Sequence, residues 1–176
     1  MDYFFDFILL LMIYFLFFYP KWRLTSKRTF LLYTAFYIYL VIVLYVTVMP
    51  FEIPLGATNN QYLSTAIFMP FNDLIQGYEG AEQDIILNIL MMIPFGFLFP
   101  LIRISTIYQT VFITFLFSGS IESYQLLNGW LGTSTRIFDV TDIMTNTFGG
   151  FIGYVLCSKL KVIATINVYN KRRIHK

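Results

Sequence analysis

The sequence has little charge, a single cysteine and a single histidine. Of its 176 residues only 12% are charged, whereas 57% are hydrophobic and 20% are aromatic. A soluble globular domain carries about twice as much charge. Cys157 alone excludes an internal disulfide and a cysteine metal cluster, and His175 lies near the chain end with no zinc-binding neighbour. We therefore expect one integral membrane domain over residues 1–176, with no cofactor and no metal bound by cysteine or histidine.

Five segments are apolar for long enough to cross the hydrocarbon core of a bilayer, which takes about 20 helical residues. They predict an all-α, polytopic membrane bundle. The first segment lacks the basic start and the small-residue cleavage site of a secretory signal, so we expect it to remain as a helix. The predicted spans are Tyr3–Tyr19, Phe30–Met49, Ile85–Ile102, Ile107–Leu127 and Val140–Ser158.

The basic residues predict the orientation of these spans. Eleven of the twelve Lys and Arg fall in the first and third connections and in the tail of residues 159–176, and none falls in residues 50–84. Because basic connections stay in the cytoplasm, we expect the amino terminus outside and the carboxyl terminus inside. Topology thus accounts for the net charge of +2 without a nucleic-acid partner. Arg136 is the exception in an external connection, and we expect it to pair with a carboxylate.

The external connection of residues 50–84 is too long for a simple turn. Its middle, Leu63–Ile75, is apolar enough to lie in the membrane interface, but it is short and interrupted by Pro70. Two interpretations remain open. The segment is either a lid or re-entrant piece over the bundle, or a surface loop anchored by aromatic side chains.

Polar residues interrupt or border the last three apolar segments. Such residues are costly in hydrocarbon and indicate a functional site by default. On helices, Asn88 shares a face with Asp84, Glu122 shares a face with Gln125, and residues 139, 142 and 146 form a stripe. The predicted topology puts all of them on the outer side, so we expect one outward-facing pocket. The candidate ligand-binding residues are Asn88, Glu122, Gln125, Arg136, Asp139, Asp142 and Asn146.

Proline and glycine residues have structural roles in the same helices. Pro94, followed closely by Gly96, should kink the third span, because proline removes a backbone donor and collides with the preceding turn. Gly149, Gly150 and Gly153 continue the polar stripe of the last span and would let a neighbouring helix approach closely. We therefore expect this stripe to face protein rather than lipid.

Three ordered runs resemble the VanZ-like family. They are Asp84-Ile-Ile-Leu-Asn88 with Pro94-Phe-Gly96, then Ser120-Ile-Glu122-Ser-Tyr-Gln125, then Arg136-Ile-Phe-Asp139-Val-Thr-Asp142 continuing through Asn146 to Tyr154. The resemblance is strongest over residues 84–154 and weaker at Pro70-Phe71. It implies a bacterial cell-membrane protein associated with resistance to the glycopeptide antibiotic teicoplanin. The implied role is that of an accessory envelope protein that reduces access of lipoglycopeptide to its target.

Three interpretations of the pocket remain open. It could bind the headgroup of a membrane lipid, a lipid-linked cell-wall precursor or a lipoglycopeptide, with Arg136 and the asparagines as contacts. It could instead serve an intramembrane enzyme acting on a lipid-linked envelope substrate, with Glu122, Asp139 and Asp142 as acid–base or metal-binding groups. It could also be a scaffold that holds helices together. We expect binding, because the sequence offers no evident nucleophile–base pair; it does not indicate the oligomeric state.

Overall fold

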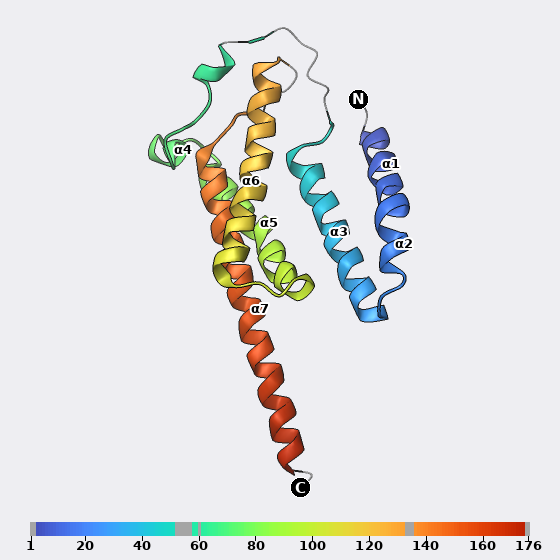
Figure 1. Cartoon of the computed structure of the whole chain (residues 1–176). Coiled ribbons are helices and arrows are strands. Elements are labelled where there is room, and N and C mark those ends of the chain that lie inside the picture. The colour runs from blue at the N-terminus through green and yellow to red at the C-terminus, as the bar shows by residue number, and fades with distance from the viewer. Residues whose placement is uncertain (1–2, 52–57, 60, 133–135, 175–176) are drawn as a thin grey trace.

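The computed structural model describes residues 3–51, 58–59, 61–132 and 136–174, and of residues 162–174 the backbone alone. The described chain is helical and contains no strand beyond one isolated bridge, in agreement with the predicted all-α class. Figure 1 shows an amino-terminal helical hairpin beside a helical bundle. The elements are α1 (Tyr3–Ile13), the π-helical η1 (Tyr14–Phe18), α2 (Tyr19–Trp22), α3 (Lys27–Thr47), the 3₁₀ turn η2 (Tyr62–Ser64), α4 (Asn72–Ile75), α5 (Ala81–Ile102), α6 (Ile107–Trp130) and α7 (Val140–Ile174).

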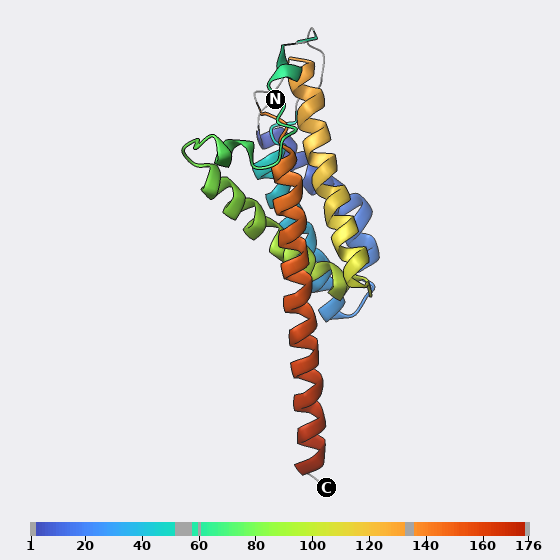
Figure 2. The same cartoon turned by 90° about the vertical axis from the view of Figure 1, so that its left-hand side faces the viewer.

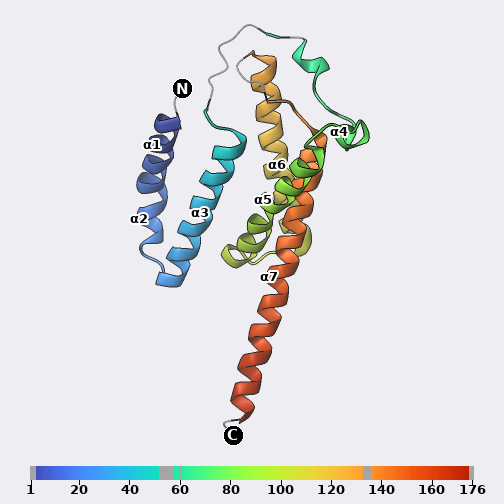
Figure 3. The ribbon, with the colours of Figure 1, turned by 180° about the vertical axis from the view of Figure 1, so that it is seen from behind.

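Large aromatic side chains join the two arms of the hairpin. The α1–η1–α2 segment runs antiparallel to α3, as seen from behind in Figure 3. The Tyr37 hydroxyl donates to the Leu10 carbonyl at 2.6 Å, and the hydroxyls of Tyr14 and Thr34 lie 3.0 Å apart. The rings of Phe18 and Tyr37 lie 5.3 Å apart, within the range of favourable aromatic pairs. The helices of the hairpin therefore pack through bulky side chains.

The bundle of α5, α6 and α7 packs through glycine. A Cβ atom at Gly96 of α5 would overlap the backbone carbonyl of Gly150 on α7, and Gly149 and Gly153 meet backbone carbonyls of α5 in the same way. Small residues of this kind allow two helix backbones to touch. Figure 2 shows α5 crossing α7, with the first turns of α5 splayed away from it. The α5 helix continues through Pro94, and a kink there stays a prediction.

An apolar core connects the hairpin to the bundle. The Tyr39 hydroxyl of α3 donates to the Met91 carbonyl of α5 at 2.8 Å, in the turn that precedes Pro94. Partly buried side chains of α3, α5 and α6 surround the core. Its buried members are Val43, Met92, Phe95 and Ile121.

Three helical segments have the length and hydropathy needed to cross a membrane, namely Tyr3–Trp22, Lys27–Thr47 and Ala81–Ile102. They correspond to the first three predicted spans. The two other long helices, α6 and α7, are more polar and do not meet the hydropathy criterion for a membrane span. Helix α7 also extends past Ser158, where its span was predicted to end, to Ile174. The Lys161 ammonium beyond that point donates to the Pro100 carbonyl near the end of α5, at 3.0 Å.

The connection predicted to be external is called the external segment below. Its described residues 61–84 lie along the ends of the bundle (Figure 1). Ile67 forms a parallel bridge with Asp139, and its N–H donates to the Phe138 carbonyl at 2.8 Å. The two helical turns of this segment, η2 and α4, are far shorter than the roughly 20 residues of a membrane span. Exposed apolar side chains in this segment include Leu63, Phe68, Met69, Leu74 and Ile75. The described part of the segment thus packs on the bundle without crossing a bilayer.

Candidate functional site

A cavity of about 330 Å³ lies where α5 and α7 begin. Its walls come from four parts of the chain: the last turn of α3, the external segment, the first two turns of α5, and the loop and first turn of α7. The polar residues among its walls are Asp73, Asp84, Asn88, Asp139, Thr141 and Asp142. The structure therefore brings Asn88, Asp139 and Asp142, three of the seven predicted ligand-binding residues, to one cavity.

The Asn88 amide joins the two helices that border the cavity. Asn88 lies on α5 one turn after Asp84, and its Nδ2 donates to Asp142 Oδ1 at 2.7 Å. Asp142 lies in the first turn of α7, where exposed backbone N–H groups favour a carboxylate. The contact positions one oxygen of Asp142 and leaves its carboxylate at the cavity wall.

Asp139 precedes the first residue of α7 and caps it. Its Oδ1 accepts a hydrogen bond from the Thr141 N–H at 2.7 Å, and aspartate is one of the preferred residues at such a position. The Asp139 N–H in turn donates to Glu122 Oε2 at 3.1 Å. Glu122 is only 2% exposed and does not line the cavity. Its carboxyl group therefore stabilises the loop at Asp139 by accepting a hydrogen bond from the backbone of that residue.

Two other predicted site residues bind helices to one another. The Asn146 side chain is buried, and its amide donates to Ser118 Oγ of α6 at 2.9 Å. The Gln125 amide donates to the Thr47 carbonyl at the end of α3, also at 2.9 Å. Neither side chain lines the cavity. Asn146 thus joins two helices of the bundle, and Gln125 joins the bundle to the hairpin.

Arg136 lies at the surface, before the loop that forms the cavity. Its backbone carbonyl accepts a hydrogen bond from the buried Tyr62 hydroxyl, and the Tyr62 ring packs directly against Gly129. Burial raises the pKa of the Tyr62 hydroxyl above its ordinary value of 10.0, so the group keeps its proton and donates. This contact attaches the external segment to the loop. The pairing of the Arg136 guanidinium with a carboxylate stays a prediction.

Several cavity residues, including Asp84, were not among the predicted site residues. Phe71 and Asp73 belong to the external segment, and Thr141 follows Asp139. The Phe71 N–H donates to Thr141 Oγ1 at 2.9 Å, which fixes the external segment over the start of α7. Asp73 could have been identified from the sequence, because it is an acidic residue inside an otherwise apolar stretch. For Phe71 the sequence offered only the weaker family resemblance at Pro70-Phe71, which did not place its side chain at the cavity.

The cavity carboxylates are spread around its wall. Among the described residues, no group of three histidine, cysteine, aspartate or glutamate side chains comes close enough to hold a metal ion. The described lining contains four aspartates and no lysine, arginine or histidine. The arrangement therefore gives a negatively charged wall without a compact set of metal ligands.

The fold and this cavity define a helical membrane protein with a polar cavity at one end of its bundle. The VanZ/LLP1 family model matches residues 36–163, from within α3 to beyond the middle of α7. The match covers most of the chain and includes every residue of the cavity, so the chain belongs to the VanZ/LLP1 family. No curated protein and no solved structure matches it.

Proposed function

We propose that this protein is an accessory protein of the bacterial cell envelope that lowers susceptibility to teicoplanin and related lipoglycopeptides. It acts by binding a lipid, or a lipid-linked cell-wall precursor, through the headgroup. Membership of the VanZ/LLP1 family supports the resistance role. The observation that carries the binding role is the cavity at the start of α5 and α7, whose polar side chains come from three separate parts of the chain.

In this proposal all five long helical segments cross the membrane, with the amino terminus outside. Support comes from the burial of polar side chains along α6, which lowers its mean hydropathy without exposing those groups to lipid. These include Thr110, Thr114, Ser118, Glu122 and Gln125. The basic residues support the orientation, because the first and third connections lie at the end opposite the starts of α5 and α7 (Figure 1).

An enzyme built on Glu122, Asp139 and Asp142 has less support. Catalysis requires the acid and the base to reach a common substrate. Glu122 does not line the cavity and instead accepts a hydrogen bond from the Asp139 backbone. A purely structural role also has less support, because Asp73 and Asp84 line the cavity although neither joins two helices.

The topology can be tested by labelling single cysteines in a Cys157→Ser background. Leu63→Cys lies in the external segment and is exposed, so a membrane-impermeant maleimide should label it in intact cells. Asn170→Cys lies near the carboxyl end and should be labelled only after the cells are opened. Labelling of Asn170→Cys in intact cells would overturn the proposed orientation.

The resistance role can be tested with Asn88→Ala and Asp142→Asn, which alter the cavity wall. Glu79→Gln is the matched control, because Glu79 is an exposed acidic residue outside the cavity. Teicoplanin susceptibility, membrane abundance and thermal stability should be measured on the same cells. We expect both cavity variants to reach normal abundance yet lose protection, and the control to protect like the parent.

Two results would contradict this proposal. If loss of protection always follows loss of folded protein, the polar residues serve as a scaffold. If both cavity variants protect like the parent, the function lies elsewhere in the molecule.

A further inference from the structure

The charge of the cavity restricts the chemistry of its ligand. Asp73, Asp84, Asp139 and Asp142 all line it, and the described lining includes no basic side chain. Carboxylates attract a cation and repel a phosphate or a second carboxylate. The group that enters this cavity should therefore be positively charged.

The shape of the cavity favours an organic cation over a metal ion. The described acidic residues form no group compact enough to hold a metal. The volume of about 330 Å³ falls at the lower end of the range for small-molecule sites, roughly 300–1,000 Å³. Apolar walls, including Leu74 and Ile85, complement the carbon atoms that an ammonium group carries. An alkylammonium group suits both parts of this lining.

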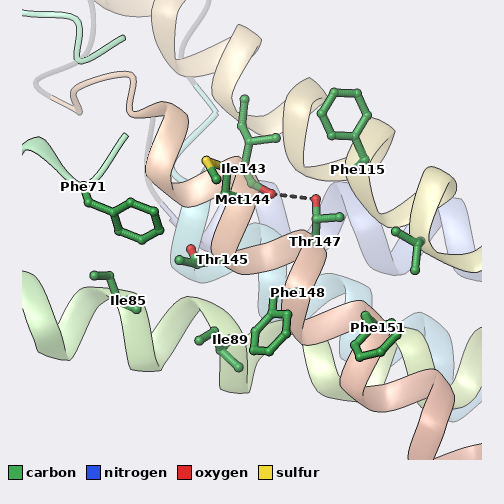
Figure 4. Close-up of a pocket in the computed structure, with 11 residues that line it drawn as sticks. Phe71, Ile85, Ile89, Phe115, Ile143, Met144, Thr145, Thr147, Phe148 and Phe151 are labelled. Carbon is green, nitrogen blue, oxygen red and sulfur yellow. Dashed lines mark hydrogen bonds between the residues drawn. The ribbon is translucent and has the colours of Figure 1, made fainter. Parts of the chain in front are cut away.

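A second, apolar groove of about 590 Å³ adjoins the cavity. Figure 4 shows its walls, which come from Ile85 and Ile89 on α5, Phe115 on α6, and residues 143–151 of α7. Phe71 and Ile85 line both the cavity and the groove. The two spaces are therefore neighbours, with the polar one nearer to the helix ends.

The groove has a length and direction suited to an acyl chain. It follows α7 from Ile143 to Phe151, which at 1.5 Å per residue corresponds to roughly 12 Å. One leaflet of a hydrocarbon core of about 30 Å is only slightly deeper than this. A lipid with its headgroup at the start of α5 and α7 would thus place a chain along the groove within the same leaflet.

Phe71 is the side chain at the junction of the two spaces. It is the only non-glycine residue with positive φ in the described chain (φ 57°, ψ 25°), a conformation that bulky residues rarely adopt. Its backbone N–H is held by Thr141 Oγ1 at 2.9 Å. This fixed backbone places the Phe71 ring in the wall that the cavity and the groove share (Figure 4).

We propose that the cavity and the groove together bind one membrane lipid whose headgroup carries a free ammonium group. The ammonium lies among the aspartates of the cavity, and one acyl chain lies in the groove between α5, α6 and α7. This inference rests on the proposed function, in which the cavity binds a lipid headgroup, and it names the class of lipid.

The test compares two lipids with identical acyl chains on the purified full-length protein. Dioleoylphosphatidylethanolamine carries the ammonium group, and dioleoylphosphatidylglycerol does not. Native mass spectrometry measures how much of each lipid the protein retains. We expect a preference of about fivefold for the ethanolamine lipid, which one partly exposed ion pair can supply. Equal retention of the two lipids would overturn the inference.

Two variants examine the two parts of the site. Asp84→Asn combined with Asp142→Asn should abolish the preference, whereas Glu82→Gln, on the same helix as Asp84 but outside the cavity, should keep it. Ile143→Trp fills the groove and should reduce retention of the ethanolamine lipid. Leu156→Trp, exposed on α7 outside the groove, should not. A double variant that keeps the preference would contradict the role of the aspartates, and unchanged retention by Ile143→Trp would contradict the role of the groove.

A soluble amine shares the ammonium chemistry and must be distinguished from a lipid. Spermidine should displace the ethanolamine lipid only weakly, because it lacks an acyl chain for the groove. Binding of spermidine that equals that of the lipid, and that Ile143→Trp does not change, would assign the cavity to a soluble amine instead.

The lipid measurement is independent of antibiotic resistance. A protein that prefers the ethanolamine lipid but does not protect cells would keep this inference and contradict the proposed function. A protein that protects cells through its cavity but prefers neither lipid would contradict this inference and keep the proposed function.

Discussion

The α1–α3 hairpin and the α5–α7 bundle are held together in different ways. In the hairpin, bulky aromatic rings separate the helices and a few hydroxyl groups cross the gap, as with Tyr37 and the Leu10 carbonyl. In the bundle, Gly96 and Gly150 let the backbones of α5 and α7 touch. Polar side chains such as Asn146 and Ser118 then meet between α6 and α7.

Buried polar side chains explain why α6 does not meet the hydropathy criterion. Both arms of the hairpin and α5 pass a hydropathy criterion for membrane spans. In α6, the polar residues recur at three- and four-residue steps and are buried, whereas exposed positions include Phe112, Phe115 and Leu116. The mean hydropathy of the helix combines the buried and the exposed face, so it underestimates how apolar the exposed face is.

The largest expected effect comes from adding a methyl group at the glycine contact. Gly153→Ala would place a Cβ against the Ile93 carbonyl and the Phe97 N–H of α5, which are backbone atoms that cannot move aside easily. Overpacking of this kind costs about 1–3 kcal/mol. Thermal unfolding in a single detergent should show a lower melting temperature than for the parent.

Gly119→Ala is the matched control for this change. Gly119 also lies in a helix, but a Cβ there has no neighbour within 4 Å. Alanine favours a helix over glycine by about 1 kcal/mol, so this variant should be as stable as the parent or slightly more stable. If both alanine variants melt alike, the bundle does not depend on backbone contact.

An effect of the same order is expected from the buried carboxyl group of Glu122. Glu122→Ala leaves the Asp139 N–H without its acceptor and should destabilise the protein by about 1–3 kcal/mol. Glu122→Gln keeps an oxygen acceptor and should lose less. Thermal unfolding of the three proteins measures the difference. Equal stability of the alanine and glutamine variants would show that this hydrogen bond contributes nothing measurable.

The smallest effect is expected in the hairpin. Tyr37→Phe removes the hydrogen bond to the Leu10 carbonyl but keeps the ring, which packs at 5.3 Å from Phe18. A single hydrogen bond contributes about 0.5–1.5 kcal/mol. The variant should therefore melt close to the parent. A loss as large as that of Gly153→Ala would mean that polar contacts stabilise the hairpin as strongly as backbone contact stabilises the bundle.

The candidate site could be predicted from sequence only in part. Asn88, Asp139 and Asp142 were identified because polar side chains are rare in apolar segments, and all three line the cavity. The same argument selected Glu122, Gln125 and Asn146, which do not line it. Sequence spacing shows which helix face a residue occupies, but it does not show what lies opposite that face.

The sequence by itself determined the all-helical membrane class and the family, because long apolar runs and ordered polar motifs are local properties of the chain. Only the tertiary structure decided how the polar residues divide between the cavity and the bundle interior. That division follows from the crossing of α5 and α7 at Gly96 and Gly150 and from the attachment of Phe71 to Thr141. These contacts join residues far apart in the chain, so no local pattern specifies them.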